Sequence, residues 1–363
     1  MKVLFVLEHY YPYVGGAEKL FRQLAEELVK KGNQVQILTS KYSQDLPAEE
    51  MINGVNILRI PCHNRFGFTL LSIPYVIQKA KQADLIQTTT YNAALPAWIG
   101  GKWAKKKLIL TFHEVWGNLW HRLPFLSFFE RWAYYLFEQL IVKLPFDRVI
   151  GVSKFTVGEL IANSVPQNKV SLIYNGLTPD DYKTLKWQPS RSFEISYFGR
   201  LGVSKGLDLL LPAAAIFFKK YPDARLRLII PKTPKGIYHK INQLIAKHQL
   251  SEFLILRHNL PRETLFKELT QTSAVIIPSY SEGFCFVAAE SVAMGIPIIS
   301  SDQGALKEVV TGQFVLIKEM NIEGVLQALQ AAYDGHWTFK KHPPFLLSDT
   351  VNQYISLYET MVK

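Results

Sequence analysis

Short apolar runs alternate along the chain with longer stretches in which apolar residues recur at helical spacing. Residues 2–7 (KVLFVL) are such a run and predict a buried strand. Between Gly16 and Lys31, the apolar residues at positions 17, 20, 21, 24 and 28 share one helical face, and Gly32 ends the predicted helix. Strands that read as continuous apolar runs are buried on both faces, which is typical of a parallel sheet covered by helices.

The same pattern continues through both halves of the chain. In the first half, further strands are predicted at residues 35–39, 55–60, 84–88, 107–112, 148–152 and 170–173. The pattern breaks over 175–190, where glycine, prolines and polar residues predict a linker. It resumes with strands predicted at 193–199, 225–231, 253–257, 274–278, 297–300 and 314–318, and Ser348 or Asp349 can cap a last helix that runs to Lys363. This alternation predicts an α/β fold with two Rossmann-like, doubly wound domains.

Composition and charge exclude several classes of protein. The chain has 363 residues, of which 48% are hydrophobic and 20% charged, as in globular proteins of about two domains. Cys62 and Cys285 form no CxxC pair, so neither a disulfide framework nor a zinc ribbon is expected. There is no signal-peptide pattern and no run of 18 apolar residues, which favours a cytoplasmic protein. The net charge of +11 fits anionic partners, but no nucleic-acid-binding motif accompanies it, so nucleic acid is not expected.

Three loops that follow predicted strands carry candidate chemistry. The first, Pro12-Tyr-Val-Gly15-Gly16, opens the first helix. Paired glycines there let backbone N–H groups approach a phosphate or sugar oxygen at the positive end of a helix. The alternative is a tight turn that needs a positive φ. Because the motif is not GxGxxG, a nicotinamide cofactor is disfavoured.

The second loop runs from Gly199 to Gly206 and carries Arg200 and Lys205. These two cations can converge on one diphosphate, since arginine supplies a bidentate fork and lysine a mobile point charge. The alternative is a solvated basic loop.

The third loop, Ser281-Glu282-Gly283-Phe284-Cys285, leads into a helix that carries Glu290. A carboxylate in the loop can hold sugar hydroxyls, and one on the helix can bind the vicinal hydroxyls of a ribose. The alternative is a pair of acids favoured by the helix dipole.

His113 ends the predicted strand LILTFH and is a further candidate. The segment HEVWG is not HExxH, so zinc is not implied. The other histidines show no ligand spacing, and no metal is expected. A histidine at the carboxyl edge of a sheet is more often functional than one in the core.

Together and in this order, these motifs resemble those of the retaining GT-B glycosyltransferases of family 4. The matching segments are the PxxGG loop, TFHE at 111–114, FGR…KG at 198–206, EGFxxxxxE at 282–290 with its continuation to Ser300, and, more weakly, Tyr174-Asn175-Gly176. The resemblance covers nearly the whole chain. Three residues depart from the family pattern: Cys285 and His258 stand where glycine is frequent, and Ser291 where alanine is usual.

The resemblance implies a GT-B architecture, with two domains facing across a cleft and a C-terminal crossover helix. The acceptor-side domain would span 1–181, the linker 182–189 and the nucleotide-sugar domain 190–342. Residues 343–363 would pack back on the first domain.

The resemblance also implies roles for individual residues. Arg200 and Lys205 would bind the donor diphosphate, Glu290 the ribose and Glu282 the transferred sugar. His113 would contact that sugar from the first domain. The cleft would be lined by Gly15 and Gly16, and the donor loop would include Gly283, Phe284 and Cys285.

The function implied is retaining transfer of a hexose or related sugar from a UDP- or GDP-sugar to a hydroxyl acceptor, either a glycan or a lipid-linked molecule. The nucleotide-sugar is then a substrate, and neither a cofactor nor a metal is expected. Two alternatives stay open. A GT-B sugar-nucleotide epimerase would need its own acid/base groups, and a catalytically silent GT-B partner subunit would not need the intact set of Glu282, Glu290, Arg200 and Lys205.

Aromatic residues are dense between Trp116 and Val142. Within the predicted helix 125–143, the polar positions Ser127, Arg131, Tyr134 and Glu138 form only a narrow stripe. One interpretation is a peripheral contact with an anionic membrane surface, supported by the nearby lysines at 102 and 105–107. The other is a helix buried against the core and crossover helix or in a dimer.

Overall fold

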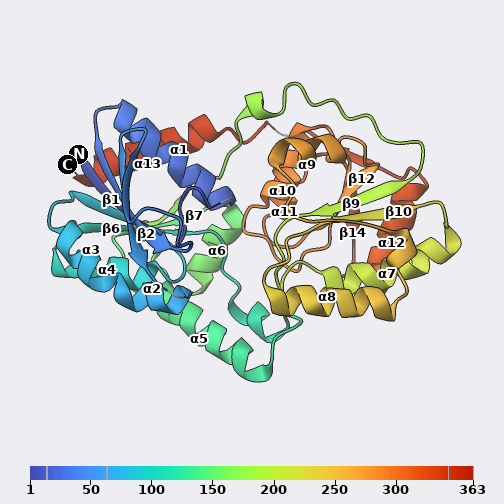
Figure 1. The fold of residues 1–363 in the computed structure, drawn as a ribbon, viewed down its shortest axis with the longest axis horizontal. Helices are drawn as coiled ribbons and strands as arrows, with labels where there is room; N and C mark the ends of the chain where they lie inside the picture. Colours follow the sequence, from blue (N-terminus) through green and yellow to red (C-terminus); the bar gives the residue numbers. More distant parts are fainter. Residues whose placement is uncertain (14, 63, 342, 363) are drawn as a thin grey trace. The chain divides into compact units, whose positions relative to one another are not determined.

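The computed structural model describes residues 1–13, 15–62, 64–341 and 343–362. Two compact units make up the chain (Figure 1). Unit 1 comprises Met1–Gly117, Ala133–Gly176 and Phe345–Lys363, and unit 2 comprises Asn118–Trp132 and Leu177–Pro344.

Unit 1 is built on an eight-stranded sheet in the order β3-β4-β2-β1-β5-β6-β7-β8. All neighbouring strands are parallel except β3 and β4. The strands are β1 (Lys2–Val6), β2 (Gln34–Lys41), β3 (Glu49–Ile52), β4 (Val55–Pro61), β5 (Leu85–Thr89), β6 (Lys107–Phe112), β7 (Arg148–Gly151) and β8 (Val170–Leu172). Strands β2, β3 and β4 lie on one side of β1, whereas β5 to β8 lie on the other side. The strand order therefore reverses between β1 and β5.

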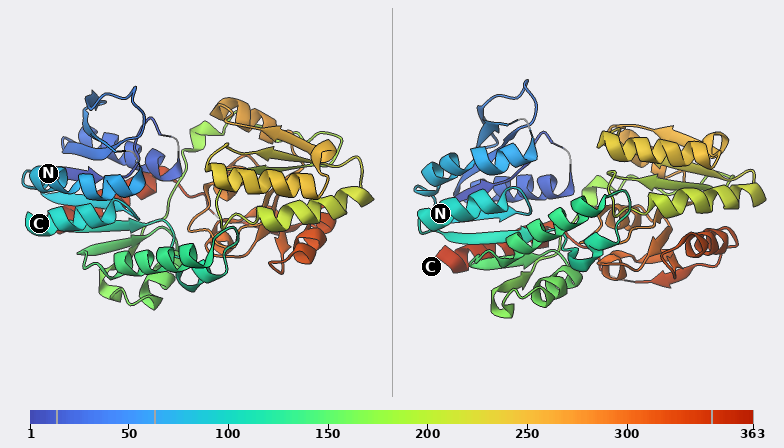
Figure 2. Two further views of the ribbon diagram at one scale, coloured as in Figure 1. Left: turned by 60° about the horizontal axis from the view of Figure 1, so that its bottom comes forward. Right: turned by 90° about the horizontal axis from the view of Figure 1, so that it is seen from below.

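Helices cover both faces of this sheet, since alternate residues of β1 enter two different cores. Val3 and Phe5 pack with one face, and Leu4 and Val6 with the other. The first core includes side chains of α1 (Gly16–Lys30) and α13 (Leu347–Val362), and the second those of α2 (Arg65–Leu71), α3 (Ile73–Ala80), α4 (Ala94–Trp103), α5 (Phe128–Lys143) and α6 (Lys154–Ala162). Figures 1 and 2 show the sheet between α1 and α13 on one side and α2–α4 on the other.

The C-terminal helix α13 belongs to unit 1. Its Tyr354 hydroxyl lies 2.9 Å from Thr111 Oγ1, and its Tyr358 hydroxyl donates to Gln87 Oε1 at 3.1 Å. A Cβ atom on Gly176 would overlap the backbone of Leu346, so the returning chain requires glycine there. The predicted crossover helix is therefore confirmed.

Unit 2 has a seven-stranded sheet in the order β11-β10-β9-β12-β13-β14-β15, parallel except for β15. Its strands are β9 (Glu194–Phe198), β10 (Arg225–Ile229), β11 (Leu254–Arg257), β12 (Ala274–Ile277), β13 (Ile298–Ser301), β14 (Gly312–Ile317) and β15 (Thr338–Lys340). Its helices are α7 (Leu207–Lys220), α8 (Lys235–Lys247), α9 (Arg262–Leu269), α10 (Phe286–Ala293), α11 (Leu306–Val309) and α12 (Ile322–Tyr333). The order reverses between β9 and β12.

The predicted fold class, two doubly wound α/β domains of GT-B type, is confirmed. The sequence pattern misses β3 and β15, which pair antiparallel at the sheet edges. Their residues are largely exposed, so neither strand carries the apolar run from which the others are predicted. Among the described residues, no helix combines the length and apolarity needed to cross a bilayer.

Candidate active site

The carboxyl ends of β9 and β12 form the candidate site of unit 2. In open α/β sheets, ligands bind where the strand order reverses, outside the carboxyl ends of the strands. The loop after β9 carries Arg200 and Lys205, and the loop after β12 carries Glu282. The topology therefore brings two of the three predicted motifs to one point.

Backbone contacts fix the two loops against each other. Gly206, at φ 68°, is the N-cap of α7, and a Cβ atom there would overlap the carbonyl oxygen of Pro278. The Tyr280 N–H donates to the Ser204 carbonyl oxygen at 2.7 Å. Glycine is required at position 206 both for its positive φ and for this close approach.

Glu282 is buried and accepts two hydrogen bonds on the same oxygen. Lys205 Nζ donates to Oε1 at 2.8 Å, and Ser279 Oγ donates to it at 2.7 Å. Its backbone carbonyl accepts from Ala305 N–H at 2.8 Å. Within the described part of the chain, Oε2 has no hydrogen-bond partner, which leaves it available to a ligand hydroxyl. Arg200 is exposed on the same loop as Lys205.

Glu290, on α10, belongs to a second cluster that the sequence did not reveal. Its Oε1 accepts from the Tyr182 hydroxyl and from Arg262 Nη2, both at 3.1 Å. Arg262 Nη2 also donates to the Tyr182 hydroxyl at 2.7 Å, and its guanidinium lies 4.6 Å from the ring centre of Phe266. Burial and the charge of Glu290 raise the pKa of Tyr182. Tyr182 falls in the predicted linker, and no local pattern pairs it with α9 or α10.

The structure accommodates the three residues that depart from the family pattern, although Cys285 adopts a backbone conformation that favours glycine. Cys285 is buried and lies in the left-handed region at φ 72°, where glycine carries the smallest penalty. The Ser291 hydroxyl donates to the Val287 carbonyl oxygen at 2.8 Å. The His258 ring nitrogens lie 2.9 Å from the Ile230 carbonyl oxygen and 3.2 Å from the Tyr238 hydroxyl.

Unit 1 carries the other predicted site residues. His113 follows β6 and is half-buried, with its ring 6.2 Å from that of Phe21. Gly15 precedes α1 at φ −168°, and Gly16 is the first residue of that helix. The alternative of a turn that needs a positive φ is therefore wrong for Gly15.

Glu138, one of the four residues of the narrow polar stripe of α5, is fully buried. Its carboxylate accepts from Gly117 N–H at 2.6 Å, from Trp116 N–H at 3.1 Å and from the Tyr91 hydroxyl at 2.7 Å. The helix thus turns this polar position inward, where it shapes the loop after His113. Several of its apolar positions, among them Phe128, Phe129, Trp132, Leu136 and Leu140, are exposed instead.

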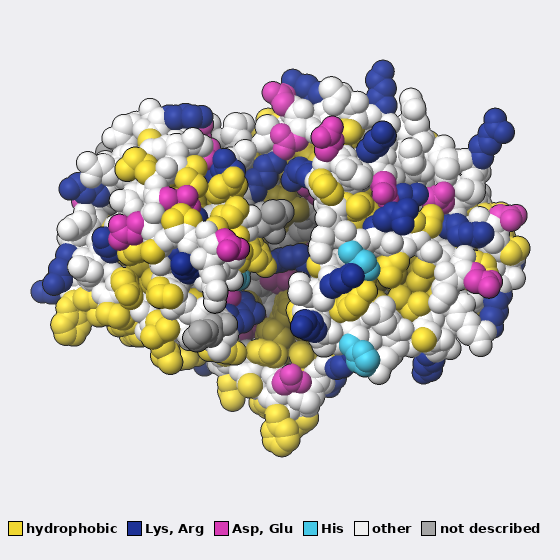
Figure 3. Space-filling view, in the orientation of Figure 1, with side chains coloured by type: hydrophobic (Ala, Val, Ile, Leu, Met, Phe, Trp, Pro, Cys, Tyr) yellow, Lys and Arg dark blue, Asp and Glu magenta, His cyan; other side chains and the backbone are white. Residues whose placement is uncertain are grey.

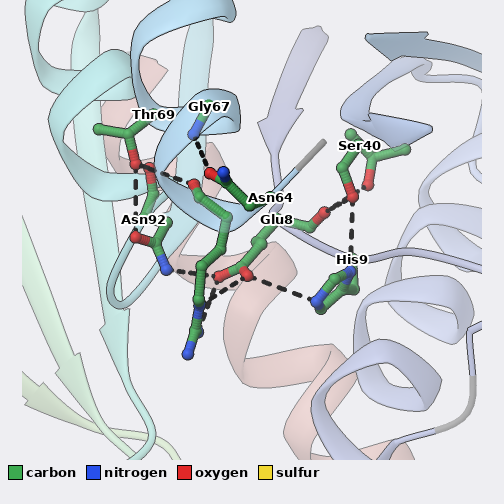
Figure 4. A network of polar contacts seen from close by, with 9 residues as sticks. Glu8, His9, Ser40, Asn64, Gly67, Thr69 and Asn92 are labelled. Atoms are coloured by element: carbon green, nitrogen blue, oxygen red, sulfur yellow. Dashed lines mark hydrogen bonds and ion pairs between the residues drawn. The ribbon is translucent and has the colours of Figure 1, made fainter. Parts of the chain in front are cut away.

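A polar network that sequence reasoning missed lies where the strand order reverses in unit 1 (Figure 4). Glu8, just beyond β1, accepts from Arg65 Nε at 3.0 Å, from Arg65 Nη2 at 3.1 Å and from Asn92 Nδ2 at 2.9 Å. His9 Nε2 lies 3.4 Å from Glu8 Oε1. Burial alone would raise the pKa of Glu8, but the hydrogen bond from His9 and the charge of Arg65 outweigh it and lower the pKa to about 2.

This lowered pKa predicts a loss of stability in acid. Because the folded state holds Glu8 ionised, its contribution is present above the ordinary pKa of 4.5 and disappears as the pH falls toward 2. The shift corresponds to about 3 kcal/mol of unfolding free energy. Urea unfolding of the wild type and of Glu8→Gln between pH 6 and 2 measures it, with the exposed Glu252→Gln as control. Parallel pH profiles for wild type and Glu8→Gln would contradict the assignment.

Two Rossmann-like units in one chain are the architecture of the GT-B glycosyltransferases. A family model described as Glycosyltransferase Family 4 matches residues 14–181, and one described as Glycosyl transferases group 1 matches residues 186–338. The chain belongs to this family of enzymes and is a glycosyltransferase.

Individual relatives are distant but similar over most of their length. An uncharacterized glycosyltransferase of Methanocaldococcus jannaschii is 25% identical over 344 residues, covering 85% of this chain and 83% of that protein. A human protein named as a subunit of phosphatidylinositol N-acetylglucosaminyltransferase is 23% identical over 341 residues, covering 91% and 68%. Among solved structures, sucrose-phosphate synthase from Thermosynechococcus elongatus has a TM-score of 0.76 at 20% identity, covering 99% and 98%. Anabaena HepE in complex with UDP-glucose has a TM-score of 0.72 at 17% identity, covering 99% and 100%. At these sequence identities, the structural similarity supports the fold alone.

Proposed function

We propose that the chain is a retaining glycosyltransferase that moves a hexose or related sugar from a UDP- or GDP-sugar to a hydroxyl acceptor, a glycan or a lipid-linked molecule. The observation that carries the donor side of this proposal is the Lys205–Glu282 pair at the point where the strand order of unit 2 reverses. There a cation and a carboxylate are fixed side by side, and helix α10, which follows the Glu282 loop in the chain, carries a second carboxylate cluster at Glu290.

In this proposal, each of these groups binds a different part of the nucleotide-sugar. Lys205 and Arg200 bind the diphosphate, and Glu290 binds the ribose hydroxyls. Glu282 accepts from the hydroxyls of the sugar through Oε2. When the bond between sugar and phosphate breaks, negative charge grows on the leaving diphosphate, and a cation already in place stabilises it without reorganisation. The departing phosphate takes the acceptor proton, and no metal ion is needed.

Known proteins support the choice of substrates. The Anabaena protein similar to this chain was solved with UDP-glucose, and the human relative is named as a subunit of a phosphatidylinositol N-acetylglucosaminyltransferase. A lipid acceptor would also account for the exposed apolar side chains of α5. We therefore propose a cytoplasmic enzyme that works peripherally at an anionic membrane surface.

A panel of nucleotides tests the donor. UDP, GDP, ADP and their sugars are each added to the full chain at saturation, and the midpoint of thermal unfolding is measured. A ligand at one hundred times its Kd stabilises the folded state by about 2.7 kcal/mol, so one base should raise the midpoint by several degrees. Incubation with that donor should release its nucleoside diphosphate. No shift with any nucleotide would contradict the proposal, and conversion of the donor into an isomeric nucleotide-sugar would favour an epimerase.

A further inference from the structure

The reversal point of unit 1 has the features of a second ligand site. The segment after β1 contributes Glu8 and His9, and the segment after β5 contributes Asn92, so the Glu8–Asn92 hydrogen bond spans the two strands between which the order reverses. This is the position at which open α/β sheets bind ligands. The residues of the network point toward one another there in Figure 4.

Arg65 is the group in this network that reaches solvent. Its side chain is 60% exposed, although Nε and Nη2 both donate to the buried carboxylate of Glu8. A guanidinium has five N–H groups, and the other three bond to no residue in the described part of the chain. Fixing an exposed guanidinium on a buried carboxylate orients a planar donor fork, which suits the oxygens of a phosphate group.

Aromatic rings line the same edge of the sheet. The rings of His9 and Tyr13 are stacked with centres 4.2 Å apart, and that of Tyr42 stands edge-on to Tyr13 at 5.3 Å. Tyr42 is partly exposed. The rings supply flat apolar surface beside the polar network, a combination that is common in small-molecule sites.

An apolar stripe begins directly after Arg65 and follows α2 into α3. Its members are Phe66, Leu70, Leu71 and Tyr75, and the first three are 60%, 67% and 51% exposed. Phe66 and Leu70 lie four residues apart on α2 and so share one face of that helix. Leu71 is the last residue of α2, and Tyr75 lies in the first turn of α3. Figure 3 shows hydrophobic side chains gathered over this side of unit 1. A contiguous exposed apolar surface of this kind marks an interaction site.

Positive charge lies at the other end of the same helical layer. Helix α3 packs against α4, which ends at Trp103 with 72% of that residue exposed. Lys102 and Lys105 are exposed beside Trp103, and Lys81 is exposed just after α3. An exposed tryptophan among lysines is typical of a surface that meets anionic lipid headgroups.

We propose that this face of unit 1 binds an anionic lipid, whose headgroup phosphate is held by Arg65 and whose chains contact the apolar stripe. The headgroup ring lies against Tyr13 and Tyr42, and the lysines near Trp103 contact neighbouring anionic lipids. The charge and the apolar surface on one helical layer together favour an amphiphile. That this lipid is the acceptor of the transferred sugar rests on the proposed function, whereas the binding itself does not.

Sedimentation with vesicles tests the binding. The full chain is mixed with two kinds of vesicle. One contains phosphatidylcholine alone, and the other contains phosphatidylcholine with one part in five of phosphatidylinositol. We expect the wild type to pellet mainly with the anionic vesicles and less at high salt. The stripe variant Leu70→Ser/Leu71→Ser and the headgroup variant Arg65→Gln should each reduce the bound fraction about tenfold or more. The control variants, Ile216→Ser and Arg191→Gln, change exposed residues of unit 2 and should bind like the wild type.

A titration with a water-soluble phosphate ester distinguishes binding of a lipid headgroup from binding of a free phosphate. Glycerol 3-phosphate is titrated into the chain with UDP or GDP at saturation, so that the diphosphate site is filled. We expect weak binding that Arg65→Gln abolishes and the stripe variant leaves unchanged. Binding of glycerol 3-phosphate without vesicle binding would overturn the lipid assignment.

Two further outcomes would also overturn the proposal. One is vesicle binding that survives both variants, and the other is vesicle binding that is lost only when Phe129 of α5 is changed to serine. If the nucleotide panel fails while these results hold, the proposed function fails and the lipid site stands.

Discussion

Replacing Lys205 by alanine should lower the turnover of sugar transfer by about 10²–10³-fold, the usual effect of removing one preorganised group that stabilises transition-state charge. Lys205 Nζ is fixed 2.8 Å from Glu282 Oε1, so it is in place before the donor arrives. The loss should fall mainly on kcat, because the charge on the leaving phosphate grows only as the bond breaks.

The control for this prediction is Lys219→Ala, which removes an exposed lysine from α7 without touching the site. Lys205→Ala leaves Glu282 with Ser279 as its remaining side-chain donor, so the melting temperature of each variant is measured beside its kinetics. A folded Lys205→Ala protein with normal donor binding and normal turnover would show that the cation does not act on the diphosphate.

Glu290→Gln and Glu282→Gln should affect different steps. A ribose contact exists in the ground state and the transition state alike, so Glu290→Gln should weaken nucleotide binding about tenfold or more and change kcat little. Glu282→Gln should mainly lower kcat, since in the proposed function Glu282 binds the sugar at which the bond breaks. Steady-state kinetics with varied donor measure both effects.

The Glu290 variant has a matched control within its own cluster. Arg262→Gln removes the cation that donates to Glu290 Oε1 but leaves the carboxylate and the Tyr182 hydroxyl in place. Its effect on nucleotide binding should be smaller than that of Glu290→Gln. Equal losses of nucleotide affinity for Glu282→Gln and Glu290→Gln would remove the proposed division between sugar and ribose.

The fold was predictable because its central strands are buried on both faces. Burial turns each of them into an apolar run, and the linker and helices between the runs then follow. The Lys205 and Glu282 motifs were predictable for a related reason, since both sit in short loops at carboxyl ends of strands, and the topology brings such loops together.

The two polar clusters that the sequence did not reveal form through contacts between segments that are distant in the chain. Tyr182 and Arg262 come from a predicted linker and from the start of α9, 80 residues apart, and meet only in the folded unit. Glu8 and Arg65 are separated by 57 residues. No periodicity within either segment carries that information.

Helix α5 shows how composition alone can mislead. Its polar positions form only a narrow stripe, and Glu138 of that stripe is buried. Two N–H groups of the loop after β6 and the Tyr91 hydroxyl need an acceptor there. The surplus of apolar residues in this helix lies on the surface, where side chains such as Phe129 are exposed. The buried and exposed faces of α5 can be assigned only once the burial of the Glu138 carboxylate is known.

Isothermal titration calorimetry tests the diphosphate site most directly. The nucleoside diphosphate and the nucleoside monophosphate of the base identified by the nucleotide panel are each titrated into the wild type, Lys205→Ala and Glu290→Gln. We expect the diphosphate to bind the wild type about 10–100-fold more tightly than the monophosphate does, because a charge-assisted contact to the second phosphate contributes roughly 1.5–3 kcal/mol. Lys205→Ala should remove most of that difference, and Glu290→Gln should weaken both nucleotides equally. Equal affinities for the two nucleotides in the wild type, or a difference that survives in Lys205→Ala, would contradict a diphosphate site at the reversal point of unit 2.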